Sequence, residues 1–376
     1  MEGSTTARQP RALSPAEKRN LAAVTNVLPF WNGGDVQGVL GFYEHEIVWT
    51  NVALEEVYEG HAGVGRYLNR MLTAFPDLRF DVTHKIPRGD RVAERWVITG
   101  THLGPYLGIP PTGRHAAIHG MSIVHLPEGR FLSDRFYFDT SSVLRDMGLM
   151  PSPGVFRAAP ARALLRAIVL VSKGLVRSNG AVDAPTEPAI LDDLALSDGE
   201  RQSLALLTQV IETFNRGGYR SISELVAHDV ALDNKMFVEM QIGREALVES
   251  LAVLATGFPD ATLSITQTVV RDDEIACEFR LRGRHDGPFL GVPPTGRQIS
   301  IPGISHLTIR DGKIAEIALY ADSGMLWRQL GLMPPLSFLD TSAARVSLWI
   351  AVNRARVIAA LTVSVVVALM SSRRKK

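Results

Sequence analysis

Hydrophobic residues recur at spacings of three and four near residue 20 and again near residue 205, which is the pattern of an amphipathic helix. The two series are Leu21, Val24, Leu28, Trp31 and Leu204, Leu207, Val210, Phe214. Each series follows a serine and a glutamate at capping-box spacing, Ser14 with Glu17 and Ser197 with Glu200. A glycine-bearing turn then ends each predicted helix.

After these helices the pattern changes to alternating hydrophobic and polar positions, which is typical of strands. Further predicted helices cover residues 36–43, 60–75 and 141–147. Predicted strands cover residues 47–51, 91–100, 115–126 and 131–139. Helices first and strands afterwards predict an α+β fold, with helices packed on one face of a curved, mostly antiparallel sheet.

The chain contains this pattern twice. Gly100–Arg114 and Gly283–Arg297 are identical at 11 of 15 positions, at an offset of 183 residues. The same offset relates Asn51 to Asn234, Tyr137 to Tyr320, Asp139 to Asp322, and 148–151 to 331–334. A period this long indicates a duplicated domain rather than a stacked array of short repeats.

The repeat and the composition shifts between its copies divide the chain into six segments. They are a disordered N-terminus (1–11), a first domain (12–160), a basic amphipathic helix (161–177), a linker (178–193), a second domain (194–342) and a C-terminal basic and apolar helix (343–376). The last segment contains fourteen uncharged residues, Val357–Met370, before four basic ones. That run spans only about 21 Å as a helix, against about 30 Å for a bilayer core. Two interpretations stay open: a helix packed on the protein, or a tail that associates with a membrane.

The composition limits which classes of partner and site the sequence predicts. Lys and Arg (40) balance Asp and Glu (39), so nothing electrostatic points to nucleic acid. The single cysteine, Cys277, excludes an internal disulfide and is interpreted as a buried strand residue. The first residues lack the apolar core of a signal peptide, so a cytoplasmic location is expected, with membrane association through the C-terminus as a variant. His115 and His119, four apart on a strand, lie too far from each other to share one metal ion, and neither metal nor cofactor is predicted.

The motif G-x-H-x-G-P-[YF]-L-G-[IV]-P-P-T-G-R, followed by a strand, a hairpin, a closing strand with aspartate and a Gly-Leu-Met-Pro end, resembles the SnoaL-like polyketide cyclases. These proteins, also called ester cyclases, belong to the NTF2-like superfamily. The resemblance covers Ser14–Pro151 and Ser197–Pro334. It implies two tandem cone-shaped α+β barrels, each enclosing an apolar pocket, that pair with each other within the chain.

The resemblance also implies a cofactor-independent cyclase or isomerase that acts on an apolar, polyketide-like carbonyl compound. In the family an aspartate on the closing strand is the general acid/base of an aldol ring closure, and that position is Asp139 here. The family's histidine and asparagine map to His125 and Asn51.

In the second copy, the same matching gives Asp322 as the catalytic aspartate and Asn234 as the asparagine. The histidine position holds Thr308, and His306, two residues earlier on the same strand face, is the substitute. The departure makes the first copy the better candidate for activity. Residues expected to bind substrate are Asn51, Trp49, Trp96, Tyr137, His119, Asn234, His306 and Tyr320, and Phe80, Met121 and Phe136 are further candidates for the pocket wall.

Other interpretations of the same residues remain open. Asp139 and Asp322 each precede a short helix and could be N-caps, and His125 could face solvent. An NTF2-like epoxide hydrolase would need an Asp-Arg-Asp arrangement that is not evident, although Arg95 and Arg135 lie on predicted strands. The third interpretation is a non-catalytic binding module made of two paired cones.

Overall fold

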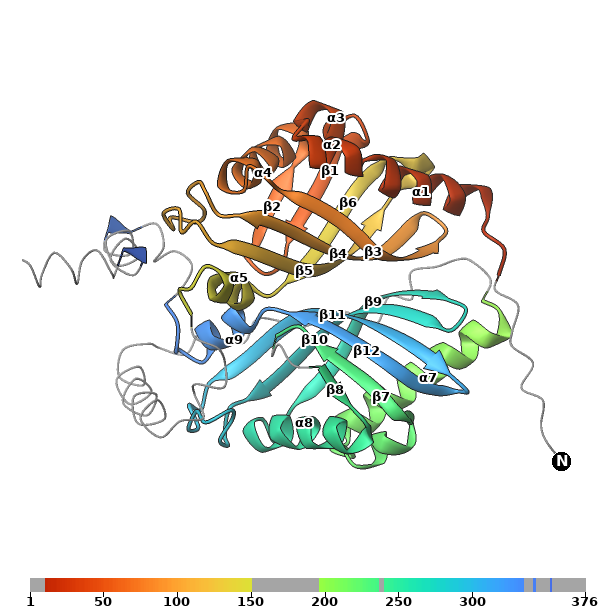
Figure 1. The fold of residues 1–376 in the computed structure, drawn as a ribbon. Helices are drawn as coiled ribbons and strands as arrows, with labels where there is room; N and C mark the ends of the chain where they lie inside the picture. The colour runs from red at the N-terminus through yellow and green to blue at the C-terminus, as the bar shows by residue number, and fades with distance from the viewer. Residues whose placement is uncertain (1–10, 151–195, 237–239, 335–340, 343–351, 354–376) are drawn as a thin grey trace, which may run out of the picture.

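The computed structural model describes residues 11–150, 196–236, 240–334, 341–342 and 352–353 (Figure 1). The segments predicted at 161–177 and 178–193, the apolar run 357–370 and almost all of the N-terminal tail lie outside these residues. Within the described part of the chain, no helix is long and apolar enough to cross a membrane.

The first domain contains five helices and one six-stranded sheet. Its helices are α1 (Pro15–Asn26), α2 (Leu28–Gly33), α3 (Val36–Leu40), α4 (Gly60–Ala74) and α5 (Thr140–Asp146). Its strands are β1 (Tyr43–Asn51), β2 (Glu56–Glu59), β3 (Arg79–Arg88), β4 (Arg91–Thr101), β5 (His115–His125) and β6 (Phe131–Phe138), and a short 3-10 turn, η1 (Pro127–Gly129), precedes β6. The sheet order is β2-β1-β6-β5-β4-β3, antiparallel throughout except for the parallel pair β1 and β6.

The second domain repeats this order as β8-β7-β12-β11-β10-β9. Its strands are β7 (Val226–Asn234), β8 (Met240–Ile242), β9 (Thr262–Arg271), β10 (Glu274–Arg284), β11 (Gln298–Arg310) and β12 (Lys313–Ala321). Its helices are α7 (Asp198–Asn215), η3 (Ser221–Glu224), α8 (Arg244–Gly257) and α9 (Ser323–Gln329). The predicted α+β class and the tandem arrangement are confirmed.

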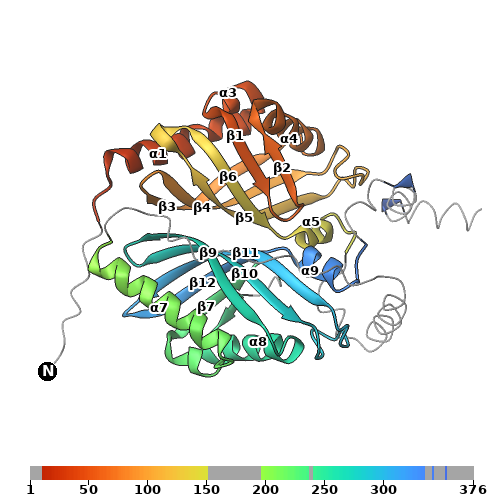
Figure 2. The same ribbon diagram turned by 180° about the vertical axis from the view of Figure 1, so that it is seen from behind.

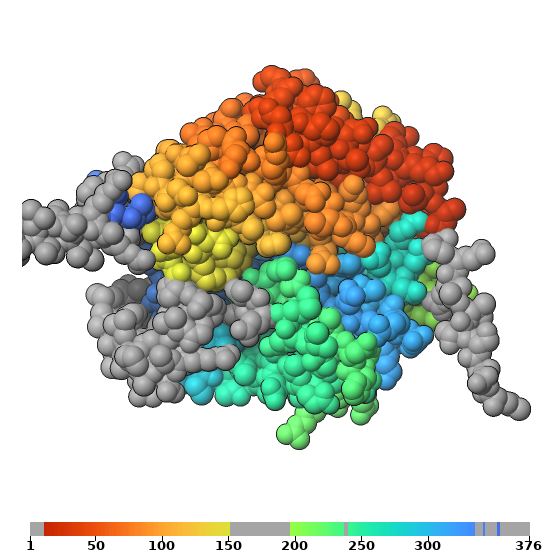
Figure 3. All heavy atoms as spheres, in the orientation of Figure 1, coloured from red at the N-terminus to blue at the C-terminus, as the bar shows by residue number. Residues whose placement is uncertain are grey.

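In each domain the long helices cover one face of the sheet, and a hydrophobic core fills the space between them. Figures 1 and 2 show these helices on the outer sides of the molecule, while the opposite faces of the two sheets look toward each other. In the space-filling view the two domains lie directly against one another (Figure 3). Both faces of each sheet are therefore covered, one by helices and one by the other domain.

The first helix of the two copies differs from the prediction in one respect. In domain 1 it ends at Asn26, and α2 begins at Leu28 with Pro29 in its first turn. Proline is favoured there because it lacks the N–H that a first turn leaves unpaired. Domain 2 has Glu212 at the corresponding position, and α7 runs unbroken to Asn215. Domain 1 therefore carries Trp31 on a separate short helix.

The repeated turn motif is held by its own side chains. His102 Nδ1 lies 3.1 Å from Thr112 Oγ1, and His285 Nδ1 lies 3.0 Å from Thr295 Oγ1. A Cβ atom on Gly104 would lie 2.0 Å from the carbonyl oxygen of Thr73, so only glycine fits against the end of α4. These contacts explain the motif as a determinant of the fold.

The facing sheets share a hydrophobic cluster that we call the interdomain face. Its buried residues are Ile86, Ala93, Met121, Ile123 and Tyr137 from domain 1 and Val269, Ala276, Ile304, Ala318 and Tyr320 from domain 2. An ion pair joins Arg88 Nη1 to Glu200 Oε1 at 2.6 Å, and Arg271 Nη1 lies 3.5 Å from Glu17 Oε2. In both cases a β-hairpin arginine of one domain contacts the capping-box glutamate of the other, so the contact has pseudo-twofold symmetry.

Candidate active site

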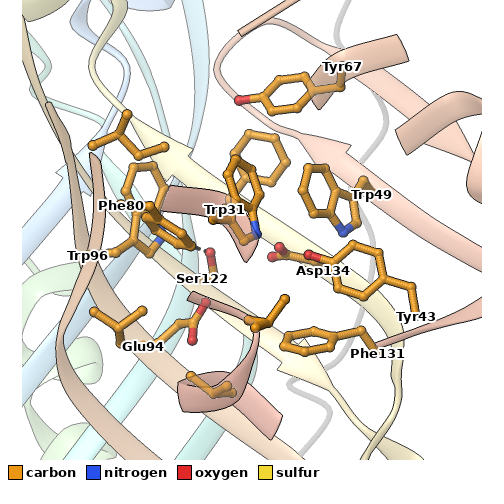
Figure 4. A pocket seen from close by; sticks show the side chains of 15 residues that line it. Trp31, Tyr43, Trp49, Tyr67, Phe80, Glu94, Trp96, Ser122, Phe131 and Asp134 are labelled. Carbon is orange, nitrogen blue, oxygen red and sulfur yellow. Dashed lines mark hydrogen bonds between the residues drawn. The ribbon is translucent and has the colours of Figure 1, made fainter. Parts of the chain in front are cut away.

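Domain 1 encloses a small cavity between its sheet and its helices (Figure 4). The cavity measures about 40 Å³. Its aromatic lining consists of Trp31, Tyr43, Trp49, Tyr67, Phe80, Trp96, Phe131 and Phe136. Two carboxylates, Glu94 and Asp134, also line it, and Figure 4 shows both among the aromatic rings. The cavity thus combines an aromatic wall with two acids.

Strand alternation places the two acids on the same face of the sheet. Glu94 lies on β4, two residues before Trp96, and Asp134 lies on β6, two residues before Phe136. The strand between them, β5, contributes Ser122, whose Oγ accepts a hydrogen bond of 2.9 Å from Trp96 Nε1. Because strands lie about 4.8 Å apart, the backbones that carry the two acids are separated by roughly 10 Å. A substrate ring could lie between the carboxyl groups.

Both acids bind protons more tightly than an exposed carboxylate does. Burial raises the pKa of Asp134 to about 7, although a hydrogen bond from Ser122 lowers it. Burial and then the charge of Asp134 raise the pKa of Glu94 to about 8, with Lys85 acting in the opposite direction. Near neutral pH the pair can therefore both accept and donate a proton.

Several polar atoms in this cavity have no hydrogen-bond partner. They include Asp134 Oδ1, Glu94 Oε2 and Trp49 Nε1, all of which are buried. An unpartnered polar atom in a protein interior costs free energy, so native structures keep few of them. One donor and two carboxyl oxygens around one space match a ligand that carries a polar oxygen.

The raised pKa of Glu94 has a consequence for stability. Its pKa is about 8 in the folded state and about 4.3 in an unfolded chain, so the folded state binds the extra proton between these values. The contribution of Glu94 to the free energy of unfolding is therefore complete below about pH 4.3 and is lost as the pH rises through about 8. We expect Glu94→Gln to flatten this fall, which denaturant titrations between pH 5 and 9 would measure. A wild-type slope unchanged in the variant would contradict the burial effect.

The structure places the predicted catalytic aspartates elsewhere. Asp139 and Asp322 line neither this cavity nor that of domain 2. Asp139 caps α5 by accepting hydrogen bonds from the backbone N–H groups of Ser141 and Ser142. Asp322 caps α9 through Gly324 and Met325. The alternative interpretation as N-caps is confirmed.

Each of these aspartates also binds the other domain. The backbone N–H and hydroxyl of Ser323 donate to Asp139 Oδ1 at 3.0 and 2.6 Å. Reciprocally, the N–H and hydroxyl of Thr140 donate to Asp322 Oδ1 at 2.9 and 2.6 Å. Arg145 adds a 3.1 Å ion pair to Asp139. Burial and then the charge of Asp322 raise the pKa of Asp139, but its oxygens are occupied by donors that join the domains.

The predicted histidines and tyrosines also lie outside the cavity. His125 Nε2 lies 2.6 Å from Asp90 Oδ2 at a hairpin end, and His119 faces the charges of Lys235 and Asp233. Three other predicted residues lie where the domains meet: Tyr137, Tyr320 and His306. His119, His125 and Tyr137 occupy strand positions that alternate with those of Ser122 and Asp134, so they point to the opposite face.

The remaining predicted residues have mixed positions. Trp49 and Trp96 line the cavity of domain 1, as do Phe80 and Phe136, whereas Met121 belongs to the interdomain face. Asn51 is buried and its Oδ1 accepts a hydrogen bond of 3.2 Å from the N–H of Leu54, which shapes the strand end. Asn234 lines the cavity of domain 2 and binds the N–H of Met236 in the same way.

The sequence interpretation missed Glu94 and Asp134. A signal was present, because each acid interrupts the apolar side of a strand that also carries Trp96 or Phe136. An acid in register with large aromatic residues is a buried acid, and buried acids mark functional sites.

One group among the described residues has the composition of a metal site. His84, Glu274 and His306 offer ligand atoms that all lie within 4.8 Å of one another, across the domain contact. Nε2 atoms of His84 and His306 lie 2.6 and 3.1 Å from Glu274 Oε1. Burial raises the pKa of Glu274, but hydrogen bonds from His306 and His84 outweigh it and bring the value to about 2. The ionised carboxylate thus holds both imidazoles. The spacing of histidines within one strand could not reveal a group assembled from two domains.

Comparison with known proteins decides the family. The family described as SnoaL-like polyketide cyclase matches residues 22–147 and 205–330, once in each domain. The chain belongs to this family. Among curated relatives, an aklanonic acid methyl ester cyclase (DauD) of Streptomyces sp. strain C5 is 27% identical over 34% of this chain and 80% of its own length. A nogalonic acid methyl ester cyclase of Streptomyces nogalater is 28% identical over 32% of this chain and 92% of its own.

Two similar solved structures each cover a little over a third of this chain. A putative SnoaL-like polyketide cyclase from Jannaschia sp. CCS1 is 25% identical, with a TM-score of 0.35, and covers 38% of this chain and 99% of its own. IdmH, a putative polyketide cyclase from Streptomyces antibioticus, is 28% identical, with a TM-score of 0.32, and covers 35% and 99%.

The two SnoaL-like domains of this chain differ in their cavities. Each of the fifteen residues that line the cavity of domain 1 has a counterpart, 183 positions later, that lines the cavity of domain 2. At the positions of Glu94 and Asp134, domain 2 has Cys277 and Ile317. Burial raises the pKa of Cys277 to about 12, so it stays a neutral thiol. The SnoaL-like cavity of domain 2 has neither acid.

Proposed function

We propose that domain 1 is a cofactor-independent acid–base catalyst of the cyclase or isomerase class, and that Asp134 transfers the proton. The observation that carries this proposal is the pair of acids, Asp134 and Glu94, with pKa values raised to about 7 and about 8 in an aromatic cavity. A general base works best when its pKa lies near the working pH. Membership of the SnoaL-like family supports the reaction class.

In the proposed reaction the ionised Asp134 removes a proton from the carbon beside a substrate carbonyl. The electron pair left on that carbon attacks a second carbonyl of the same molecule and closes a ring. Glu94, which is protonated at neutral pH, gives its proton to the resulting alkoxide. Trp49 Nε1, which has no protein partner, would donate a hydrogen bond to the same oxygen. The substrate's proton thus ends on Asp134 and returns to Glu94 through water.

The aromatic wall supports a flat, apolar substrate, because rings stack on aromatic faces. The curated relatives are named for methyl esters of aklanonic and nogalonic acid. A cavity of about 40 Å³ holds water rather than such a molecule. We therefore propose that substrate binding displaces aromatic side chains, with Trp31 on the short helix α2 foremost among them. Because Trp31, Trp49 and Trp96 all line the cavity, binding should change the tryptophan fluorescence.

The epoxide hydrolase alternative requires an arginine near the acids, and neither candidate arginine lies there. Arg95 Nε donates to the hydroxyl of Tyr320 at 3.1 Å, and Arg135 Nε lies 3.1 Å from Glu278 Oε1. Both arginines therefore point toward domain 2, away from the face that carries Asp134. No specific observation favours this reaction over proton transfer beside a carbonyl.

We also propose that the two domains pair within one chain and that each supplies the sheet-face partner that a single domain would lack. The matched contacts of Arg88 with Glu200 and of Arg271 with Glu17 support this pairing. So do the exchanged hydrogen bonds of Asp139 and Asp322. The arrangement is that of an isologous dimer interface, made by two copies in one polypeptide.

The pH dependence of turnover tests the acid–base proposal. With aklanonic or nogalonic acid methyl ester as substrate, kcat/KM should rise through about pH 7, because Asp134 must be ionised. It should fall through about pH 8, because Glu94 must be protonated. Glu94→Gln should remove the alkaline limb and leave the acid limb. A profile that is flat from about pH 6 to 9 would overturn the assignment, since it would show that neither acid takes part.

A further inference from the structure

The cavity of domain 2 is much larger than that of domain 1, and neither of the two cavity acids is present in it. It measures about 1130 Å³, against about 40 Å³. Ligand pockets for drug-sized molecules occupy about 300–1,000 Å³. Every lining position of domain 1 has a lining counterpart here, so side-chain replacement contributes to the difference, and this cavity extends further, to Leu144, Leu149 and Met150 beside α5.

Most of the aromatic lining positions of domain 1 carry smaller, non-aromatic side chains in domain 2. Of the eight aromatic lining positions of domain 1, five carry aliphatic residues in domain 2 and one carries Ser250, in place of Tyr67. The aliphatic replacements are Val226, Leu232, Leu263, Ile314 and Leu319. Packing changes accordingly: α4 buries Tyr67, Leu68 and Met71 against its sheet, whereas α8 buries only Leu247 and Gly257. The space between α8 and its sheet is therefore less filled by side chains than the space between α4 and its sheet.

Charged side chains are few among the described residues that line this cavity. The charged residues of its lining are Arg145, Asp146 and Glu249. Arg145 is paired with Asp139, Asp146 accepts a hydrogen bond from the N–H of Ala117, and Glu249 is exposed. A wall with so few polar partners does not hold water well, and a charged ligand would lose its hydration without compensation.

We infer that domain 2 is a non-catalytic binding site for an uncharged, predominantly aliphatic molecule of the long-chain acyl ester or isoprenoid class. The size of the cavity, its aliphatic wall and the replacement of both acids by Cys277 and Ile317 carry this inference together. On α8, Val253 lines the cavity and is also 41% exposed, so the cavity lies close to the surface there. The inference does not depend on the chemistry of domain 1.

The test uses the full chain and a neutral fluorescent probe, N-phenyl-1-naphthylamine. We expect saturable binding that a long-chain fatty alcohol displaces. The double variant Leu232→Trp, Ser250→Tyr restores the domain 1 side chains and should weaken the probe at least tenfold. The control Val57→Trp adds a ring at an exposed position outside both cavities and should bind like the wild type. Equal binding by the folded double variant, or no displacement by the alcohol, would overturn the inference.

The only cysteine of the chain provides a second readout that needs no cavity-filling variant. Cys277 lines the cavity, so an apolar maleimide reports on this site alone. A bound long-chain alcohol should slow alkylation at least tenfold, whereas the same concentration of glycerol should not. An alkylation rate unchanged by saturating alcohol would show that the cavity is not where it binds.

Discussion

Replacing Asp134 by Asn is expected to lower kcat by about 10²–10⁴-fold, the range that a positioned general acid or base contributes. The amide has the shape of the carboxyl group but cannot accept the substrate proton. Because the change also removes a buried acid from an aromatic cavity, the folded protein should not lose stability. KM should change little, since the aromatic wall that we propose binds the substrate stays intact.

The matched control is Asp139→Asn on the same segment of the chain. Asp139 caps α5 and accepts hydrogen bonds from Ser323, so its loss should lower thermal stability and leave kcat within a few-fold. Steady-state assays on both variants, with the methyl esters of aklanonic and nogalonic acid as test compounds, distinguish the two aspartates. Circular dichroism checks that each variant is folded. Full turnover by Asp134→Asn, or its loss in a folded Asp139→Asn protein, would reverse the assignment.

Replacing Arg88 by Ala is expected to lower the free energy of unfolding by about 3–5 kcal/mol, because it leaves a buried charge without its partner. Arg88 and Glu200 have fully buried side chains, and their contact joins the two domains. Ser197 and Arg88 overcome the effect of burial and lower the pKa of Glu200, so its carboxylate stays ionised near neutral pH. Arg11, 3.8 Å from Glu200, is a weaker remaining partner.

Chemical denaturation followed by fluorescence and circular dichroism measures this loss. The control is Arg310→Ala, which breaks an ion pair with Asp229 whose side chains are 55% and 63% exposed. Surface pairs of this kind contribute less than about 1 kcal/mol. If the two variants were equally stable, the Arg88 contact would not hold the domains together in solution.

The sequence predicted the fold well because the fold depends on local signals. Capping boxes at Ser14 and Ser197, the glycine-bearing turns and strand alternation are each determined by neighbouring residues. The repeat then confirmed the order of elements. The break at Pro29 was missed, although proline in a first turn is a local signal of a new helix.

The site was harder to predict because both faces of each sheet carry buried apolar residues. Alternation on β6 separates Asp134 and Phe136 from Arg135 and Tyr137, but it does not show which set faces the helices. Tyr137 was predicted to line the cavity, but it lies on the face of the sheet that meets domain 2. Asp139 was chosen because the family resemblance implies a catalytic aspartate at that position, whereas in the structure Asp139 and its counterpart Asp322 both cap a helix. The cavity acids do not recur, since only one copy keeps them.

The joining of both copies in one polypeptide has a consequence for how the two cavities can vary. In a homodimer of identical chains, every substitution falls in both subunits at once. Here parts of the surfaces that meet carry like residues in both copies, as in Ala93 with Ala276 and Tyr137 with Tyr320. Behind those surfaces each copy is free to change alone, and the two cavities differ: one has two acids, and the other has a larger volume and neither acid. The two halves of a tandem chain can therefore have different roles, whereas the two subunits of a homodimer must have the same sequence.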